Sequence, residues 1–147
     1  MSFPAEPGAP DAPAELHSTL PAVALCEPDG PLRTLFEEWL QRGGYTPLRC
    51  GCVACAARVV LVIADFPMPQ CEGAGRIAML RRRFPGARVL AISSQFTPRM
   101  HGATAAAATL GVDAVLAKPF SCEPFMAQVR ALVGSAAASA AGAVPRC

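Results

Sequence analysis

Short, uninterrupted runs of apolar residues recur along the chain, and they limit the folds open to it more than any other feature. Each run is four to six residues long and does not alternate with polar residues. Both faces of each predicted strand must therefore be covered, which is typical of a parallel sheet between layers of helices. A weaker run at 45–49 contains Pro47, which favours an edge strand because proline cannot donate a ladder hydrogen bond. The four strong runs are 22–26, 59–64, 89–92 and 114–117.

Between these runs, apolar residues recur every three or four positions, as they do along one face of a helix. Leu32, Phe36 and Leu40 show this spacing, and Gly43 ends their segment. In the next helix the arginines, including Arg76, are expected to face solvent. Alternating strands and helices predict an α/β fold, with a doubly wound five-stranded parallel sheet of flavodoxin-like order 2-1-3-4-5. The predicted helices are 31–42, 73–84, 98–110 and 122–133, and the region 50–57 has room for only about two helical turns.

The predicted domain spans 21–134 of the 147 residues, between two tails. Residues 1–20 are rich in Pro and Ala, and residues 135–147 are mostly Ala, Ser and Gly. The formal net charge of +2 gives no basic footprint for nucleic acid, and no apolar run approaches the roughly 18 residues of a membrane span. Because the N-terminus lacks a basic start followed by an apolar stretch, we expect a cytoplasmic location.

The cysteines leave a second class of protein open. Seven is an odd number, and without a secretion signal it argues against a disulfide framework. Cys50, Cys52 and Cys55 are closely spaced, so a small flavodoxin-like metal or redox protein remains an alternative. A zinc site would need a fourth ligand, and both histidines lie far away in the sequence. The simpler interpretation is small thiols in a short connector, which a visible spectrum and a metal assay would distinguish from a metal site.

Polar side chains follow four of the predicted strands. Glu27 and Asp29 follow the first strand, Asp65 the third, Ser93 the fourth and Lys118 the fifth. Because sites in open α/β sheets lie beyond the carboxyl ends of the strands, we expect these side chains to converge. Carboxylates suit a divalent cation and lysine suits a phosphoryl group, so the pattern predicts a cation and phosphoryl site at this edge.

Two motifs at these strand ends make the prediction more specific. A D-x-x-M-P-x-x-x-G pattern begins at Asp65, and a Lys-Pro-Phe triplet begins at Lys118. With Ser93 ending the strand between them, residues 21–134 resemble the receiver domain of bacterial response regulators, the CheY-like family. The resemblance implies a phosphoprotein of two-component phosphorelay signal transduction, with no enzyme activity beyond catalysing its own phosphorylation and dephosphorylation.

The resemblance also implies a role for each site residue. Asp65 would accept a phosphoryl group from a sensor histidine kinase or a phosphotransfer protein. Lys118 would pair with the phosphoryl oxygens, and Ser93 would donate a hydrogen bond to one of them. Mg²⁺ would be held by Glu27, Asp65 and the backbone carbonyl of Pro67, with Asp29 as a further candidate ligand.

The chain departs from the family at two positions that matter for function. Pro28 stands where the family usually has a second acid, so we expect weak Mg²⁺ binding. Val115 stands where the family usually has an aromatic switch residue. No DNA-binding domain is expected in the short segment after residue 134, so the protein would act through a protein partner on the 98–133 face, with a homodimer as one option. A degenerate receiver that binds partners without phosphorylation is the alternative.

Overall fold

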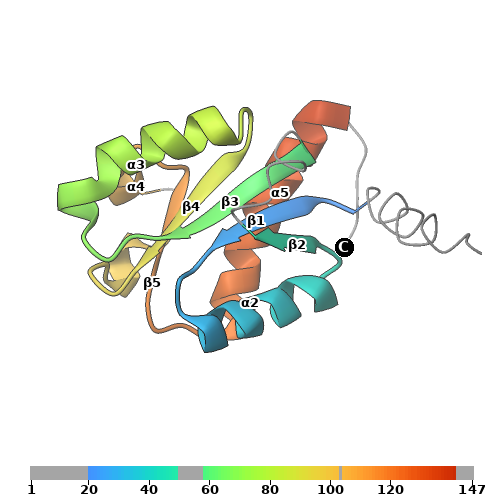
Figure 1. Cartoon of the computed structure of the whole chain (residues 1–147), viewed down its shortest axis with the longest axis horizontal. Helices are drawn as coiled ribbons and strands as arrows, with labels where there is room; N and C mark the ends of the chain where they lie inside the picture. Colours follow the sequence, from blue (N-terminus) through green and yellow to red (C-terminus); the bar gives the residue numbers. More distant parts are fainter. Residues whose placement is uncertain (1–19, 50–57, 103, 142–147) are drawn as a thin grey trace, which may run out of the picture.

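Five parallel strands form one sheet in the predicted order, β2-β1-β3-β4-β5 (Figure 1). The structure is a computed structural model that describes residues 20–49, 58–102 and 104–141, with side chains described as far as residue 134. The predicted fold class is confirmed, and the proline-containing strand β2 lies at the edge of the sheet as expected. The strands are β1 (Ala22–Cys26), β2 (Thr46–Arg49), β3 (Val59–Asp65), β4 (Arg88–Ser93) and β5 (Ala114–Ala117).

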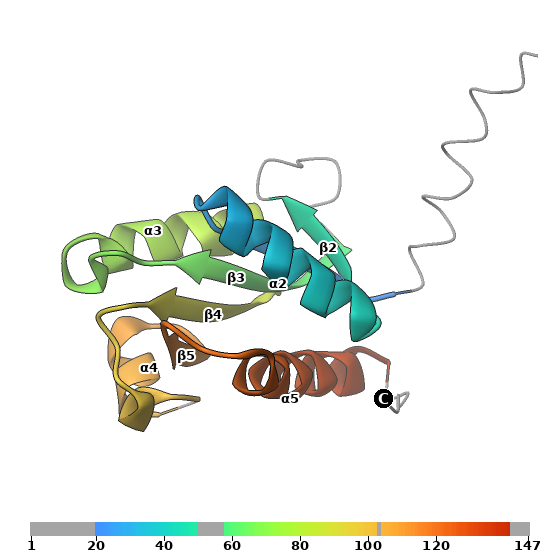
Figure 2. The ribbon, with the colours of Figure 1, turned by 90° about the horizontal axis from the view of Figure 1, so that it is seen from below.

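Helices cover both faces of the sheet, which explains why β1, β3, β4 and β5 are largely apolar (Figures 1 and 2). Along β1, Ala24 packs in the layer of α3 and α4, whereas Val23 and Leu25 pack in the layer of α2 and α5. All three side chains are buried. The helices are α2 (Gly30–Arg42), α3 (Pro69–Arg83), α4 (Ala105–Leu110) and α5 (Cys122–Ala141).

Helix α2 starts immediately after the acidic end of β1. The Asp29 side chain caps it by accepting a hydrogen bond from the backbone amide of Leu32 at 3.0 Å. Pro31 lies in the first turn, where its missing N–H costs nothing. The sharp turn from strand to capped helix directs Glu27 across the carboxyl edge of the sheet.

Two helices are longer than their apolar spacing predicts. Helix α3 begins at Pro69 rather than at residue 73, and the Glu72 carboxylate accepts a hydrogen bond from the Met68 amide at 3.0 Å, stabilising the earlier start. Helix α5 continues to Ala141. The first residues of the predicted C-terminal tail are therefore helical, because alanine favours helix even without an apolar stripe.

The segment predicted as one helix over 98–110 is not continuous. A 3₁₀ turn at Pro98–Met100 is followed by Gly102, and α4 is only six residues long. Gly102 and Val115 exchange backbone hydrogen bonds of 2.8 and 3.0 Å, so this segment pairs antiparallel with the outer edge of β5. Gly102 has φ +87°, a conformation that favours glycine and ends any helix there.

The structure corrects the expectation that the cysteines form no disulfide, and several of the cysteines lie outside the described residues. Cys26 is disulfide-bonded. The odd number of cysteines argues against a framework of several disulfides, but it does not exclude one disulfide bond. Cys71 and Cys122 are free. The Cys50, Cys52 and Cys55 cluster and almost all of the predicted N-terminal tail lie outside the described residues. In the part of the chain that is described, no helix is long and apolar enough to cross a membrane.

Candidate functional site

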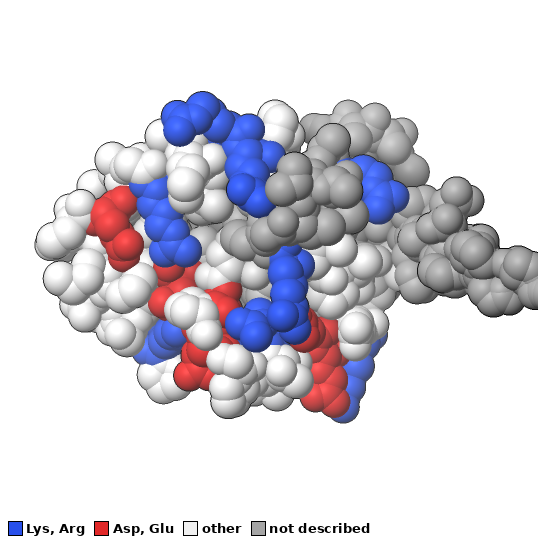
Figure 3. All heavy atoms as spheres, viewed as in Figure 1, with Lys and Arg blue, Asp and Glu red and all other residues white. Residues whose placement is uncertain are grey.

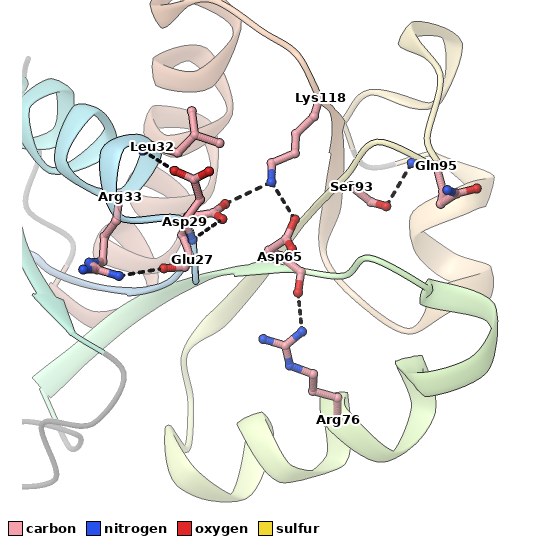
Figure 4. A network of polar contacts seen from close by, with 9 residues as sticks. All are labelled: Glu27, Asp29, Leu32, Arg33, Asp65, Arg76, Ser93, Gln95 and Lys118. Carbon is pink, nitrogen blue, oxygen red and sulfur yellow. Dashed lines mark hydrogen bonds and ion pairs between the residues drawn. The ribbon is translucent and has the colours of Figure 1, made fainter.

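The candidate site lies at the carboxyl edge of the sheet (Figure 4). Parallel register brings the strand ends level, since Cys26 of β1 pairs with Ala64 of β3 and Ser93 of β4 pairs with Ala117 of β5. Glu27, Asp65 and Lys118 therefore come from different strand ends yet lie side by side. On the face seen in Figure 3, acidic side chains gather between α3 and α2, with basic side chains at their border.

Lys118 joins the two carboxylates. Its Nζ lies 2.8 Å from Asp65 Oδ1 and 3.1 Å from Glu27 Oε1. The Glu27 and Asp65 side chains are only 1% and 9% exposed, so few water molecules can replace the ammonium as a partner. Two carboxylates and one ammonium leave the cluster with about one net negative charge when all three are ionised.

The same contacts hold Lys118 in its charged form. Partial burial alone would lower its pKa, but hydrogen bonds to Asp65 and Glu27 and the charges of both carboxylates outweigh it. The pKa of Lys118 therefore lies above its ordinary value of 10.5. At neutral pH the site contains a fixed positive charge directed at the predicted acceptor carboxylate.

The carboxylates of both acids that follow β1 already accept hydrogen bonds from backbone amides. The second carboxylate oxygen of Glu27 accepts a hydrogen bond from the Asp29 amide at 3.1 Å, and the Glu27 carbonyl accepts one from Arg33 at 3.0 Å. The Asp29 carboxylate is occupied as the cap of α2. Asp29 thus contributes to this end of the site mainly by holding Glu27 and the start of the helix.

These residues fit a tightly bound divalent cation poorly. Pro28 contributes no carboxylate, and Lys118 pairs with both Glu27 and Asp65. Pro67, whose carbonyl is the remaining predicted ligand, lies exposed in the turn between β3 and α3. Across residues 20–49, 58–102 and 104–141, no group of three or more His, Cys, Asp or Glu side chains is arranged to hold a metal ion.

Ser93 lies at the end of β4, beside Asp65, and is fully buried. Its hydroxyl oxygen accepts a hydrogen bond from the Gln95 amide at 3.0 Å. Its backbone carbonyl accepts one from the Lys118 amide at 3.0 Å, which fixes the backbone of the lysine against β4. The hydroxyl is turned toward Gln95, and its own proton remains available to a further acceptor.

One residue near the site is not among those predicted from the sequence. Arg76, expected to be solvated, donates from Nη1 to the backbone carbonyl of Asp65, and its guanidinium lies 4.8 Å from the centre of the Phe66 ring. A signal was present in the helical spacing. Arg76 falls on the stripe formed by the buried residues Gly73, Ile77 and Leu80. A cation on the buried face of a helix needs a partner there.

Comparison with known proteins supports the fold. The sequence matches no protein-family model and no curated protein. In structure it is similar to the chemotaxis protein CheY4 of Vibrio cholerae, with a TM-score of 0.60 and 20% identity over 77% of this chain and 98% of that chain. It is also similar to the signal receiver domain of a LuxO repressor protein from Vibrio parahaemolyticus, with a TM-score of 0.66 and 15% identity over 86% and 99% of the two chains.

A third similar structure was determined in a phosphorylated form. It is a response regulator from Burkholderia pseudomallei, determined with a phosphorylated aspartic acid, a calcium ion and citrate. Its TM-score is 0.57, with 20% identity over 85% of this chain and 75% of that chain. At these identities the similarity concerns the fold. The chain has the fold of CheY-like response-regulator receiver domains, with an acidic site at the expected edge of the sheet.

Proposed function

We propose that this chain is a single-domain receiver of a two-component phosphorelay in the cytoplasm, which accepts a phosphoryl group on Asp65. The donor would be a sensor histidine kinase or a phosphotransfer protein, and the output would be binding to another protein. The observation that carries the proposal is the buried Asp65 carboxylate, 2.8 Å from the Lys118 ammonium at the carboxyl edge of a receiver fold.

The proposed reaction is a displacement at phosphorus. A carboxylate oxygen of Asp65 forms a bond to phosphorus while the bond from phosphorus to the donor nitrogen breaks, and that nitrogen keeps the electron pair. Phosphoryl transfer depends mainly on positioning and on stabilising charge, and Lys118 provides a positive charge at the attacking oxygen. The Ser93 hydroxyl would donate its free proton to a phosphoryl oxygen.

Mg²⁺ would take a minor part. When bound it would neutralise charge on the transferring group, using Glu27, Asp65 and the Pro67 carbonyl, with Asp29 as a further candidate. Since Lys118 already pairs with both buried carboxylates, the ion must compete with it. We therefore propose weak binding of Mg²⁺ and assign the charge stabilisation to Lys118.

Incubation with a small phosphodonor tests the function directly. Phosphoramidate, with and without Mg²⁺, is expected to add the mass of one phosphoryl group to the intact protein, and peptide mapping should place it on Asp65. Asp65→Asn, which keeps the shape and removes the nucleophile, is the control. Persistent lack of labelling, or equal labelling of Asp65→Asn, would refute the proposal.

The alternative is a receiver that binds its partner without phosphorylation. The pairing of both buried carboxylates with Lys118 favours it, because the site is compact and charge-compensated without a phosphoryl group. A receiver of this kind would not be labelled by phosphoramidate, and Asp65→Asn would bind the partner as the unmodified protein does.

The 98–133 face is the proposed contact surface for the partner or for a second copy. Val115 itself is fully buried and offers no exposed apolar patch. The exposed Ala108 and Ala131 line a hollow of about 490 Å³ between α4, β5 and α5. Ala131→Glu should weaken self-association measured by sedimentation with and without phosphodonor, whereas Leu35→Glu on α2 should leave it unchanged; the reverse would place the contact on α2.

A further inference from the structure

The backbone carbonyl of Asp65 lies at the point where β3 ends. The next amide, that of Phe66, donates to the Ile92 carbonyl of β4 at 2.8 Å. Because N–H and C=O of a trans peptide point in opposite directions, the Asp65 carbonyl points away from β4, toward the side of β1. Strand β1 ends one pair earlier, at Cys26 opposite Ala64, so it supplies no further ladder donor.

Arg76 supplies the missing donor. Its Nη1 donates to the Asp65 carbonyl from α3, eleven residues further along the chain. The peptide between Asp65 and Phe66 is thus held at both ends, by Ile92 through its N–H and by Arg76 through its C=O. Because a buried carbonyl without a partner destabilises the fold, this contact helps to fix the local backbone geometry.

The guanidinium is itself fixed in place. It packs over the ring of Phe66, a fully buried residue, with 4.8 Å to the ring centre. Among the residues that the structure describes, Arg76 pairs with no carboxylate. Its charge is therefore directed at the end of β3. Figure 4 shows Arg76 and Lys118 on opposite sides of Asp65, one at the backbone carbonyl and one at the carboxylate.

We propose that Arg76 is a positioning residue for the acceptor carboxylate: by fixing the Asp65–Phe66 peptide it sets the direction in which the Asp65 side chain meets Lys118. The proposal rests on the proposed function, since the reaction it serves is phosphoryl transfer to Asp65. Arg76 does not touch the transferred group. Its effect is on the fraction of time in which Asp65 Oδ1 points at the incoming phosphorus.

Two substitutions and one matched control test the proposal. Arg76→Met keeps the length of the side chain and removes the donors, whereas Arg76→Lys keeps a single cationic donor. Arg83→Met on the same helix is the control, because Arg83 also lies over a ring, that of Phe84 at 5.7 Å, but far from the site. Thermal unfolding of each variant shows whether it is folded at the temperature of the assay.

Labelling kinetics with phosphoramidate give the functional measurement. Arg76→Met should lower the maximal labelling rate about tenfold, because catalysis depends steeply on orientation, and leave the half-saturating phosphoramidate concentration unchanged. Arg76→Lys should recover part of the rate, and Arg83→Met all of it. A change only in the half-saturating concentration, or an equal loss in Arg83→Met, would overturn the positioning role.

Nuclear magnetic resonance of the unphosphorylated protein gives a measurement that does not depend on labelling. Arg76→Met should shift the Asp65 carbonyl carbon, the Phe66 amide and the Lys118 ammonium signals, and Arg83→Met should move none of them. If the wild-type protein is never labelled, the proposed function fails while these shifts still decide whether Arg76 positions Asp65. Unmoved signals at Asp65, Phe66 and Lys118 would refute the inference even if labelling succeeds.

Discussion

Lys118 is a positive charge that two buried carboxylates share. Removing it leaves Glu27 and Asp65 facing each other without a counterion, and breaking a buried pair in this way costs about 3 kcal/mol or more. We predict that Lys118→Met lowers the free energy of unfolding by about this amount, measured by urea titration, and strongly slows labelling of Asp65. Lys118→Arg, which retains a cation, should lose less stability.

The pH dependence of that loss has a definite direction. The folded protein raises the pKa of Lys118, so its pairs stabilise fully below the ordinary lysine value of 10.5 and are lost as the pH rises through the higher folded value. The difference in unfolding free energy between the wild type and Lys118→Met should therefore stay constant from neutral pH to about 10 and shrink above it. A difference that shrinks already between pH 7 and 9 would contradict the raised pKa.

Pro28 offers a direct test of the metal prediction. Pro28→Asp adds a carboxylate beside Glu27 and should strengthen Mg²⁺ binding by roughly ten- to a hundredfold, measured by calorimetry, because a charge-assisted ligand contributes about 1.5–3 kcal/mol. Asp29→Asn is the companion variant. Asparagine caps a helix as well as aspartate, so this change should leave both stability and Mg²⁺ affinity nearly unaltered. A large loss of affinity in Asp29→Asn would instead make Asp29 a ligand.

The position of a charged residue directly after a predicted strand is enough to predict which charged side chains of this site lie together. Glu27, Asp65 and Lys118 each follow an apolar run directly, and parallel strands bring such positions to one edge. Arg76 could not be found in this way. It lies in mid-helix, where its place on the buried stripe of α3 indicates that it has a partner but does not identify that partner, because a backbone carbonyl is a group that every residue has.

Among the elements, the segment before α4 differs most from its prediction. Gly102 has φ +87°, and an added Cβ there would meet only Gln128, at 3.6 Å. Gly102→Ala should therefore cost about 1–2 kcal/mol through backbone strain rather than through a clash, measured by urea unfolding. Gly75→Ala is the control of opposite sign, because Gly75 lies inside α3 with open space around it and alanine should stabilise the helix by about 0.5–1 kcal/mol.

Strands were easier to predict than helices in this chain for a physical reason. Burial on both faces keeps β1, β3, β4 and β5 largely apolar, and all five predicted strands, including the edge strand β2, agree with the structure to within one residue at each end. The alanine-rich stretch before residue 110 has no comparable pattern of burial that would fix where its helix begins and ends. Alanine permits helix anywhere, so the extent of α4 is set by Pro98 and Gly102 and by hydrogen bonds to β5, which are tertiary contacts.

The order of the strands was predicted from the alternation of five strands with helices, but the contacts that link the site to α2 and α5 were not predicted. Four aromatic rings pack together between α2, α5 and the loop after β5, with centroid distances of 5.0–5.7 Å. Phe120 stands two residues beyond Lys118 and is one of them. We predict that a shift of Lys118 toward a phosphoryl group alters the packing of these rings between α2 and α5. The rings are those of Phe36, Trp39, Phe120 and Phe125.

Trp39, the only tryptophan of the chain, reports on this cluster. We predict that phosphoramidate changes its fluorescence at the rate at which mass spectrometry detects label on Asp65, because movement of Lys118 alters the packing of Phe120 against Phe36 and Phe125. Asp65→Asn should show no change. Phe120→Leu should keep the labelling and lose most of the fluorescence response, since it removes the ring of the cluster that lies two residues from Lys118. Labelling of Asp65 that leaves the Trp39 emission constant would show that the cluster stabilises the fold without transmitting the state of the site.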